Sequence, residues 1–255
     1  KTNNMTNKNL TKVEICCADI ESLYEAARGG AQRVELCSAL SEGGVTPYYS
    51  MIITAAALGF SSINVLIRPR MGDFVYSKEE MAGMIEDIKI AKSLGATGIV
   101  SGALLPDGTV DVENTKKLME AAQGLEFIFH RAFDMTANPT EALNCLINLG
   151  CNRLLTSGCC ENAFIGIPML YRLVALAEGR IAIMAGSGIT PQNVEDIIRK
   201  TGVDAVHASA KSIVSSRMTF RNKRANIGTE GTDEYARLLT SCDIVSQLLS
   251  KVSSI

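Results

Sequence analysis

Two short apolar runs of this chain each carry a carboxylate followed two residues later by a thiol. The first run, VEICCA, contains Glu14 and Cys16, and the second, RVELC, contains Glu35 and Cys37. Side chains two residues apart on a strand point to the same side, so all four can face one interior. Thiolate sulfur is a preferred ligand of Cu(I), and a carboxylate can act as an acid or a base. The two runs therefore allow a soft-metal site and an acid–base site at the same place.

Three more ionisable side chains fall on the inward side of other predicted strands. Arg68, His130 and His207 alternate with apolar neighbours, and each lies near the end of its run. An imidazole can serve as an acid, a base or a metal ligand near neutral pH. Because an unpaired buried charge is costly, we expect Arg68 to form an ion pair with Glu14 or Glu35. We also expect the carboxylates, Arg68 and both histidines to line one cavity.

Glycine-rich turns follow the last two predicted strands, in AGSGIT and HASAKS. The loops at these places in many barrels bind phosphate, because backbone N–H groups and hydroxyls can approach an anion closely. A Gly-x-Gly segment is also an ordinary way for a chain to turn, so both interpretations stay open. The candidate anion-binding residues are Arg70, Gly186, Ser187, Gly188, Ser209 and Lys211.

These residues need elements to hold them, and the pattern predicts eight strands that alternate with helices. Helix boundaries are marked by a capping box at Ser77 and Glu80 and by Pro139 at the start of a later helix. Even spacing over a chain of 255 residues favours an α/β fold with one (β/α)8 TIM barrel over an open doubly wound sheet. The predicted strands are 13–18, 33–37, 63–69, 98–103, 126–132, 153–158, 181–188 and 205–210.

We expect residues 1–255 to form a single domain. Residues 1–12 are polar and predict a disordered N-terminal extension, and residues 211–232 predict a long polar loop after the last strand. Such a loop can cover one end of the barrel or take part in an oligomer contact.

The composition excludes several classes of protein. Hydrophobic residues make up 47% of the chain and the net charge is −2, so a basic nucleic-acid-binding surface is not expected. No apolar run reaches the roughly 18 residues that suggest a membrane helix. Eight cysteines without a C-x-x-C pair, in a chain that opens on a polar segment, predict reduced thiols in a cytosolic protein.

Seven motifs, taken in order from about Val13 to Asn222, resemble the CutC family of copper homeostasis proteins. They are VEICCAD, RVELCSALSEGGVTP, IRPRMGDFVYS, IFHRAFD, LTSGC, AGSGIT and HASAKS. The resemblance implies a (β/α)8 barrel, a cytosolic location, assembly into homo-oligomers and a role in copper handling. It also implies that Cu(I) is held by Cys16 of E-I-C and Cys37 of E-L-C. The anion-binding segment departs from the family at Ala185, Ser187 and Lys211.

Two functions therefore stay open. In the first, the chain binds Cu(I) through Cys16 and Cys37 in copper homeostasis. In the second, it is an enzyme acting on a small anionic or phosphorylated metabolite. The acid–base candidates are Glu14, Glu35, His130 and His207, and Arg68 is the expected anion clamp. A non-catalytic scaffold would leave the inward charges unexplained.

Overall fold

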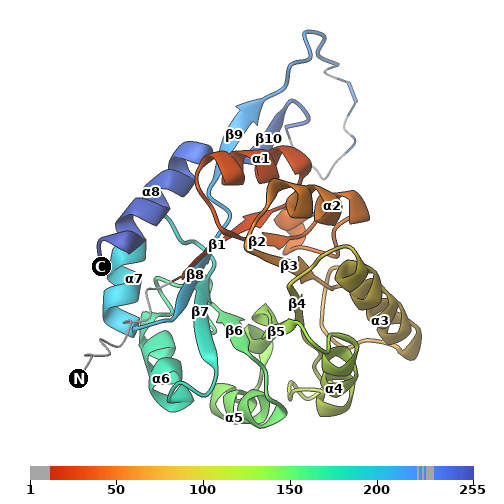
Figure 1. Ribbon diagram of the computed structural model, residues 1–255, viewed down its shortest axis with the longest axis vertical. Helices are drawn as coiled ribbons and strands as arrows, with labels where there is room; N and C mark the ends of the chain where they lie inside the picture. The colour runs from red at the N-terminus through yellow and green to blue at the C-terminus, as the bar shows by residue number, and fades with distance from the viewer. Residues whose placement is uncertain (1–11, 223, 226, 228–232) are drawn as a thin grey trace, which may run out of the picture.

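The computed structural model describes residues 12–222, 224, 225, 227 and 233–255, and its centre is a closed barrel of eight strands (Figure 1). The strands run parallel and pair in sequence order, and β8 pairs back onto β1. The barrel strands are β1 (Lys12–Cys17), β2 (Arg33–Leu36), β3 (Ser62–Leu66), β4 (Gly98–Ser101), β5 (Glu126–Phe129), β6 (Arg153–Thr156), β7 (Ala182–Gly186) and β8 (Ala205–Ala208). The predicted TIM barrel is confirmed, and the open sheet is excluded.

Helices surround the barrel on its outer side (Figure 1). They are α1 (Ile20–Arg28), α2 (Tyr49–Leu58), α3 (Lys78–Ser93), α4 (Val112–Ala121), α5 (Pro139–Leu149), α6 (Ile167–Ala177), α7 (Val194–Thr201) and α8 (Cys242–Ser253), with 3-10 turns η1 (Leu40–Glu42) and η2 (Arg131–Met135). The predicted capping box joins Ser77 and Glu80 at the start of α3, and Pro139 begins α5. In the described part of the chain, every helix is too short or too polar to cross a lipid bilayer.

The strands bury one face against the helices and the other inside the barrel. Val13, Ile15 and Cys17 belong to the outer hydrophobic core, while Cys16 and Cys37 belong to a separate cluster inside the barrel. Each large aliphatic side chain that fills the interior contributes about 1.5–3 kcal/mol by leaving water. The inward members are Leu66, Val100, Ile128, Leu155 and Met184. The predicted alternation of inward and outward residues is therefore confirmed.

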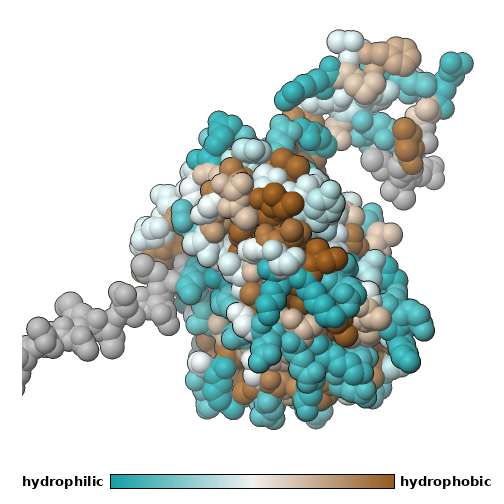
Figure 2. All heavy atoms as spheres, turned by 45° about the vertical axis from the view of Figure 1, so that its right-hand side comes forward, coloured by the Kyte–Doolittle hydropathy of each residue, from teal (hydrophilic) through white to brown (hydrophobic). Residues whose placement is uncertain are grey.

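An arm of two antiparallel strands, β9 (Lys211–Ser215) and β10 (Ala236–Thr240), follows β8. It projects from the barrel, as Figures 1 and 2 show. The predicted loop at 211–232 is thus wrong at its start, because the first five residues gain backbone pairing with β10. Residues 223, 226 and 228–232 of that loop, and 1–11 of the predicted N-terminal extension, lie outside the described residues. Association into homo-oligomers stays a prediction.

Candidate functional site

A cavity of about 570 Å³ opens at the C-terminal ends of the barrel strands. The predicted site residues that line it are Cys16, Glu35, Cys37, Arg68, His130, Ser187, Gly188, His207, Ser209 and Lys211. Strands β1, β2 and β8, the segments after β2, β3, β5, β7 and β8, and the start of β9 supply them, so the cavity draws on most of the barrel. The structure does not place Glu14, Arg70 or Gly186 in the lining.

The two inward cysteines lie side by side at the bottom of this cavity. Cys16 on β1 is paired in register with Glu35 on β2. Cys37 follows Glu35 by two residues and so points inward as well, next to Cys16. The two sulfur atoms are 3.6 Å apart, and the thiol of Cys16 donates to Oε1 of Glu35 at 3.6 Å. Both side chains are buried. Two soft donors and a carboxylate therefore converge on one point.

Cys16 is held as a neutral thiol. A hydrogen bond with Cys37, burial and the charge of Glu35 together raise the pKa of Cys16 well above its usual range. A metal ion that binds a thiolate must therefore displace a proton against this preference. The same environment protects the thiol from reactions that need a thiolate.

A chain of ionisable groups connects the cysteines to the barrel interior through His207. Nδ1 of His207 lies 2.9 Å from Oε1 of Glu14, and Nε2 lies 3.8 Å from Oε1 of Glu35. Burial alone would lower the pKa of His207, but the charge of Glu35 and the hydrogen bond with Glu14 raise it overall. Burial raises the pKa of Glu35 to about 7, although the charge of His207 opposes this. The pKa of Glu35 therefore lies near neutral pH, with Nε2 of His207 beside its carboxyl group.

Glu14 lies below the cavity rather than in its wall. It is fully buried, and it accepts from Nε of Arg33 at 3.0 Å and from Nδ2 of Asn64. Burial acts to raise the pKa of Glu14, but the hydrogen bond and charge of His207 and the charge of Arg33 outweigh it, so the pKa is lowered. The ionised carboxylate can orient His207, and the expectation that it lines the cavity is wrong.

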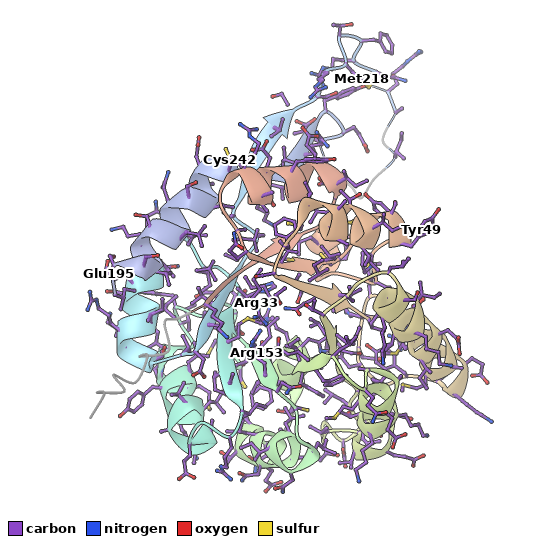
Figure 3. The ribbon with its side chains drawn as sticks, in the orientation of Figure 1. Arg33, Tyr49, Arg153, Glu195, Met218 and Cys242 are labelled. Atoms are coloured by element: carbon purple, nitrogen blue, oxygen red, sulfur yellow. The ribbon has the colours of Figure 1, made fainter. Side chains whose placement is uncertain are left out.

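An ionic network that sequence reasoning missed closes the barrel beneath Glu14. Arg33 donates to Glu126 at 2.6 Å, and Arg153 donates to the same carboxylate at 3.1 Å. Figure 3 shows Arg33 and Arg153 inside the ring of strands. Both arginines begin predicted strands, and Arg33 lies on the same side of its strand as Glu35. The sequence therefore already indicated that Arg33 points into the barrel.

Arg68 does not pair with Glu14 or Glu35, and the predicted ion pair is wrong. Its guanidinium donates to the backbone carbonyl groups of Glu42 at 3.3 Å, Gly44 at 2.9 Å and Gly72 at 2.8 Å. It also lies over the ring of Phe74, 5.0 Å from the ring centre. The guanidinium of Arg68 thus finds its partners in carbonyl groups of two loops and not in either carboxylate. Arg68 holds the cavity wall together, and most of its donors are already occupied.

Two predicted anion-binding residues lie elsewhere. Arg70 pairs with Glu80 at 2.5 Å and Asp73 at 3.1 Å, outside the cavity, because its side chain follows the loop toward the start of α3. Gly186 ends β7 inside the barrel, where an added Cβ would lie 2.6 Å from Cδ1 of Leu155. Gly186 therefore permits close packing of side chains and does not expose its backbone to the cavity.

His130 lines the cavity as a neutral side chain. Burial and the charge of Arg68 lower its pKa to about 3. Its Nδ1 accepts from the N–H of Ala132 at 3.3 Å, so Nε2 carries the proton. Nε2 is buried and has no hydrogen-bond partner among the described residues. A buried donor without a partner is costly, and an oxygen atom of a bound molecule would satisfy it.

The raised pKa of Glu35 predicts a pH-dependent stability. Folding favours the protonated carboxyl, so this stability is present below the unfolded pKa of about 4.5 and is lost as pH rises through about 7. We expect urea unfolding of the wild type to give a free energy of unfolding on the order of 2 kcal/mol lower at pH 8 than at pH 5. In Glu35→Gln this difference should disappear. The exposed Glu79→Gln is the control. An unchanged pH dependence in Glu35→Gln would contradict the assignment.

Comparisons with known proteins give a consistent result. A profile of the CutC family matches residues 11–212. The family protein CutC of Bacteroides thetaiotaomicron is 43% identical over 243 residues, covering 94% of this chain and 98% of that protein. The corresponding protein of Vibrio vulnificus strain CMCP6 is 44% identical over 246 residues, covering 96% of this chain and 98% of that protein.

Solved structures agree with the sequence comparison. The crystal structure of CutC from Streptococcus agalactiae, a candidate copper homeostasis protein, matches with a TM-score of 0.74 at 35% identity. The match covers 78% of this chain and 98% of that one. Thiamine phosphate pyrophosphorylase from Pyrococcus furiosus, 16% identical with a TM-score of 0.58 over 96% of each chain, shares the fold alone.

Proposed function

The chain belongs to the CutC family, and from this premise we propose that it acts in copper homeostasis by holding Cu(I) between Cys16 and Cys37. The observation that carries the proposal is the 3.6 Å separation of two buried sulfur atoms at the bottom of a cavity. Sulfur is the donor that Cu(I) prefers, and no large movement is needed to bring both atoms to one ion.

The distance between the sulfur atoms also favours a third ligand. Two metal–sulfur bonds of about 2.3 Å would span roughly 4.6 Å in a linear site, so sulfur atoms 3.6 Å apart meet the ion at a bent angle. Ligand atoms of Cys16, Glu35 and His207 all lie within 4.8 Å of one another. His207 suits the third position, because Glu14 binds its Nδ1 and leaves Nε2 toward the ion.

Removal of the two sulfur atoms tests the copper function. The variant that lacks both should lose tight Cu(I) binding under reducing conditions.

The state of the cysteines bears on the location of the protein. All eight cysteines are free thiols, which favours a reducing compartment, and we place the protein in the cytosol on that ground.

The size and charge of the cavity support a second function, that of an enzyme acting on a small anionic metabolite. About 570 Å³ is far more than one ion needs and lies within the usual range for small-molecule sites. Three cations, Arg68, Arg131 and Lys211, line it, against Glu35 as the one carboxylate among the described residues. In this function Glu35 and His207 act as acid and base, and His130 donates to an oxygen atom of the substrate.

A panel of small molecules tests the second function. We expect at least one sugar phosphate or small carboxylic acid to raise the melting temperature, whereas the matching neutral sugars do not. At a hundred times Kd a ligand stabilises by about 2.7 kcal/mol, which corresponds to roughly 5–10 °C for a chain of this size. Equal shifts from neutral sugars would show that the positive charge of the cavity does not select the ligand.

A further inference from the structure

Asp134, in the turn η2 after β5, is held by an unusual number of donors. Its carboxylate accepts from the backbone N–H of Ser157 at 3.1 and 3.2 Å and from that of Cys159 at 3.1 Å. The hydroxyl of Thr156 donates to it as well. The side chain is only 6% exposed. These bonds fix the carboxylate to the loop after β6, because each donor belongs to that loop or to the end of the strand.

The fixed carboxylate in turn holds Arg131. Nε of Arg131 donates to Oδ2 of Asp134 at 2.8 Å, and Nη2 donates to Oγ of Ser157 at 3.1 Å. A guanidinium has five N–H donors, so about three remain free. Nη1 has no partner among the described residues, and the side chain is 43% exposed where it lines the cavity. The network therefore presents a rigid, partly unsatisfied cation to the cavity.

A second free cation lies at the same end of the barrel. Lys211 lines the cavity, and no ion pair among the described residues involves it. Ser187, Gly188 and Ser209 also line it, and the first two have left-handed φ angles, 75° and 71°. By contrast, Arg68 is occupied by three carbonyl groups. Arg131 and Lys211 thus offer more free N–H donors than Arg68, whose Nε alone is without a partner among the described residues.

We infer that Arg131 binds the phosphate or carboxylate group of the cavity's ligand and that Asp134 is its positioning residue. The inference rests on the second function proposed above and names the residue that selects the ligand's charge. A guanidinium held by one edge keeps its other N–H groups for bidentate contact with an oxyanion. Lys211, at the start of β9, adds a second positive charge to the same cavity. The reacting part of such a ligand then extends toward Glu35 and His207.

Titration with inorganic phosphate, and separately with malonate, tests this assignment by amide NMR of the full chain. In the wild type we expect the Gly188 and Ser209 amide signals to shift with added anion. Arg131→Gln should raise the apparent Kd at least tenfold. Arg172→Gln, a change at an exposed arginine on α6, should leave the Kd unchanged. Arg131 is partly exposed, so its replacement should leave the fold intact.

The role of Asp134 is tested by a double-mutant cycle. We expect Asp134→Asn to weaken phosphate binding several-fold in the wild type and not at all in Arg131→Gln. Equal weakening in both backgrounds would overturn the positioning role. Unchanged affinity in Arg131→Gln would overturn the whole inference but leave an anionic ligand in place. No shift with either anion in the wild type would contradict both the inference and the second function.

Discussion

Cys16→Ser and Cys37→Ser are each expected to abolish tight Cu(I) binding. A hydroxyl oxygen is a poor ligand for this soft ion, and the remaining thiol cannot hold it alone. Loss of a residue that only orients a metal ligand costs 10–100-fold in affinity, so loss of a ligand itself should exceed about 100-fold. An anaerobic competition titration against a chromophoric Cu(I) chelator measures the change.

Cys242→Ser is the matched control for the copper titration. Cys242 begins α8 on the outside of the barrel (Figure 3) and should not change the affinity. The double variant Cys16→Ser/Cys37→Ser decides between the two proposed functions. Undiminished Cu(I) affinity in that variant would falsify the copper site and leave the anion-binding function.

Arg33→Met is expected to destabilise the protein by about 3–5 kcal/mol. Arg33 pairs with fully buried Glu14 and with Glu126, so its removal leaves the carboxylate of Glu14 with less compensation inside the barrel. His207 and Asn64 still contact Glu14, but neither replaces the fixed positive charge. Urea unfolding at neutral pH measures the change.

Arg28→Met gives the control for buried charge. Arg28 also pairs with a carboxylate, that of Glu25 at 2.5 Å, but its side chain is 68% exposed. A surface pair of this kind contributes at most about 1 kcal/mol, so the variant should be close to the wild type. If Arg33→Met costs no more than Arg28→Met, the ionic network at the bottom of the barrel does not stabilise the fold through pairing.

The side to which each strand residue points could be predicted from the sequence. In a closed barrel the helices cover the outer face, so apolar residues mark it and the polar alternates must face inward. This rule placed Cys16 and Cys37 inside together, and the structure brings their sulfur atoms to 3.6 Å. It also placed Glu35 and both histidines in the interior, where Glu35, His130 and His207 line the cavity.

The height of a residue along the barrel axis could not be predicted in the same way. Alternation gives the side of a strand, but height depends on the stagger between neighbouring strands, which short runs do not reveal. Glu14 therefore points into the barrel as predicted, yet it lies below the cavity. The partners of an arginine could not be predicted either, because its long side chain can contact backbone carbonyl groups of distant loops. Arg68 does so at Glu42, Gly44 and Gly72.

The closure of β8 onto β1 delays the final step of site assembly during protein synthesis. Glu14 and His207, which are in contact, are 193 residues apart in the chain. At 5–20 residues per second, the ribosome needs roughly 10–40 s to make that interval. Cys16 and Cys37 are therefore made well before His207 and Lys211. For that period the two thiols exist without the cavity that later buries them, open to copper and oxidants around the nascent chain.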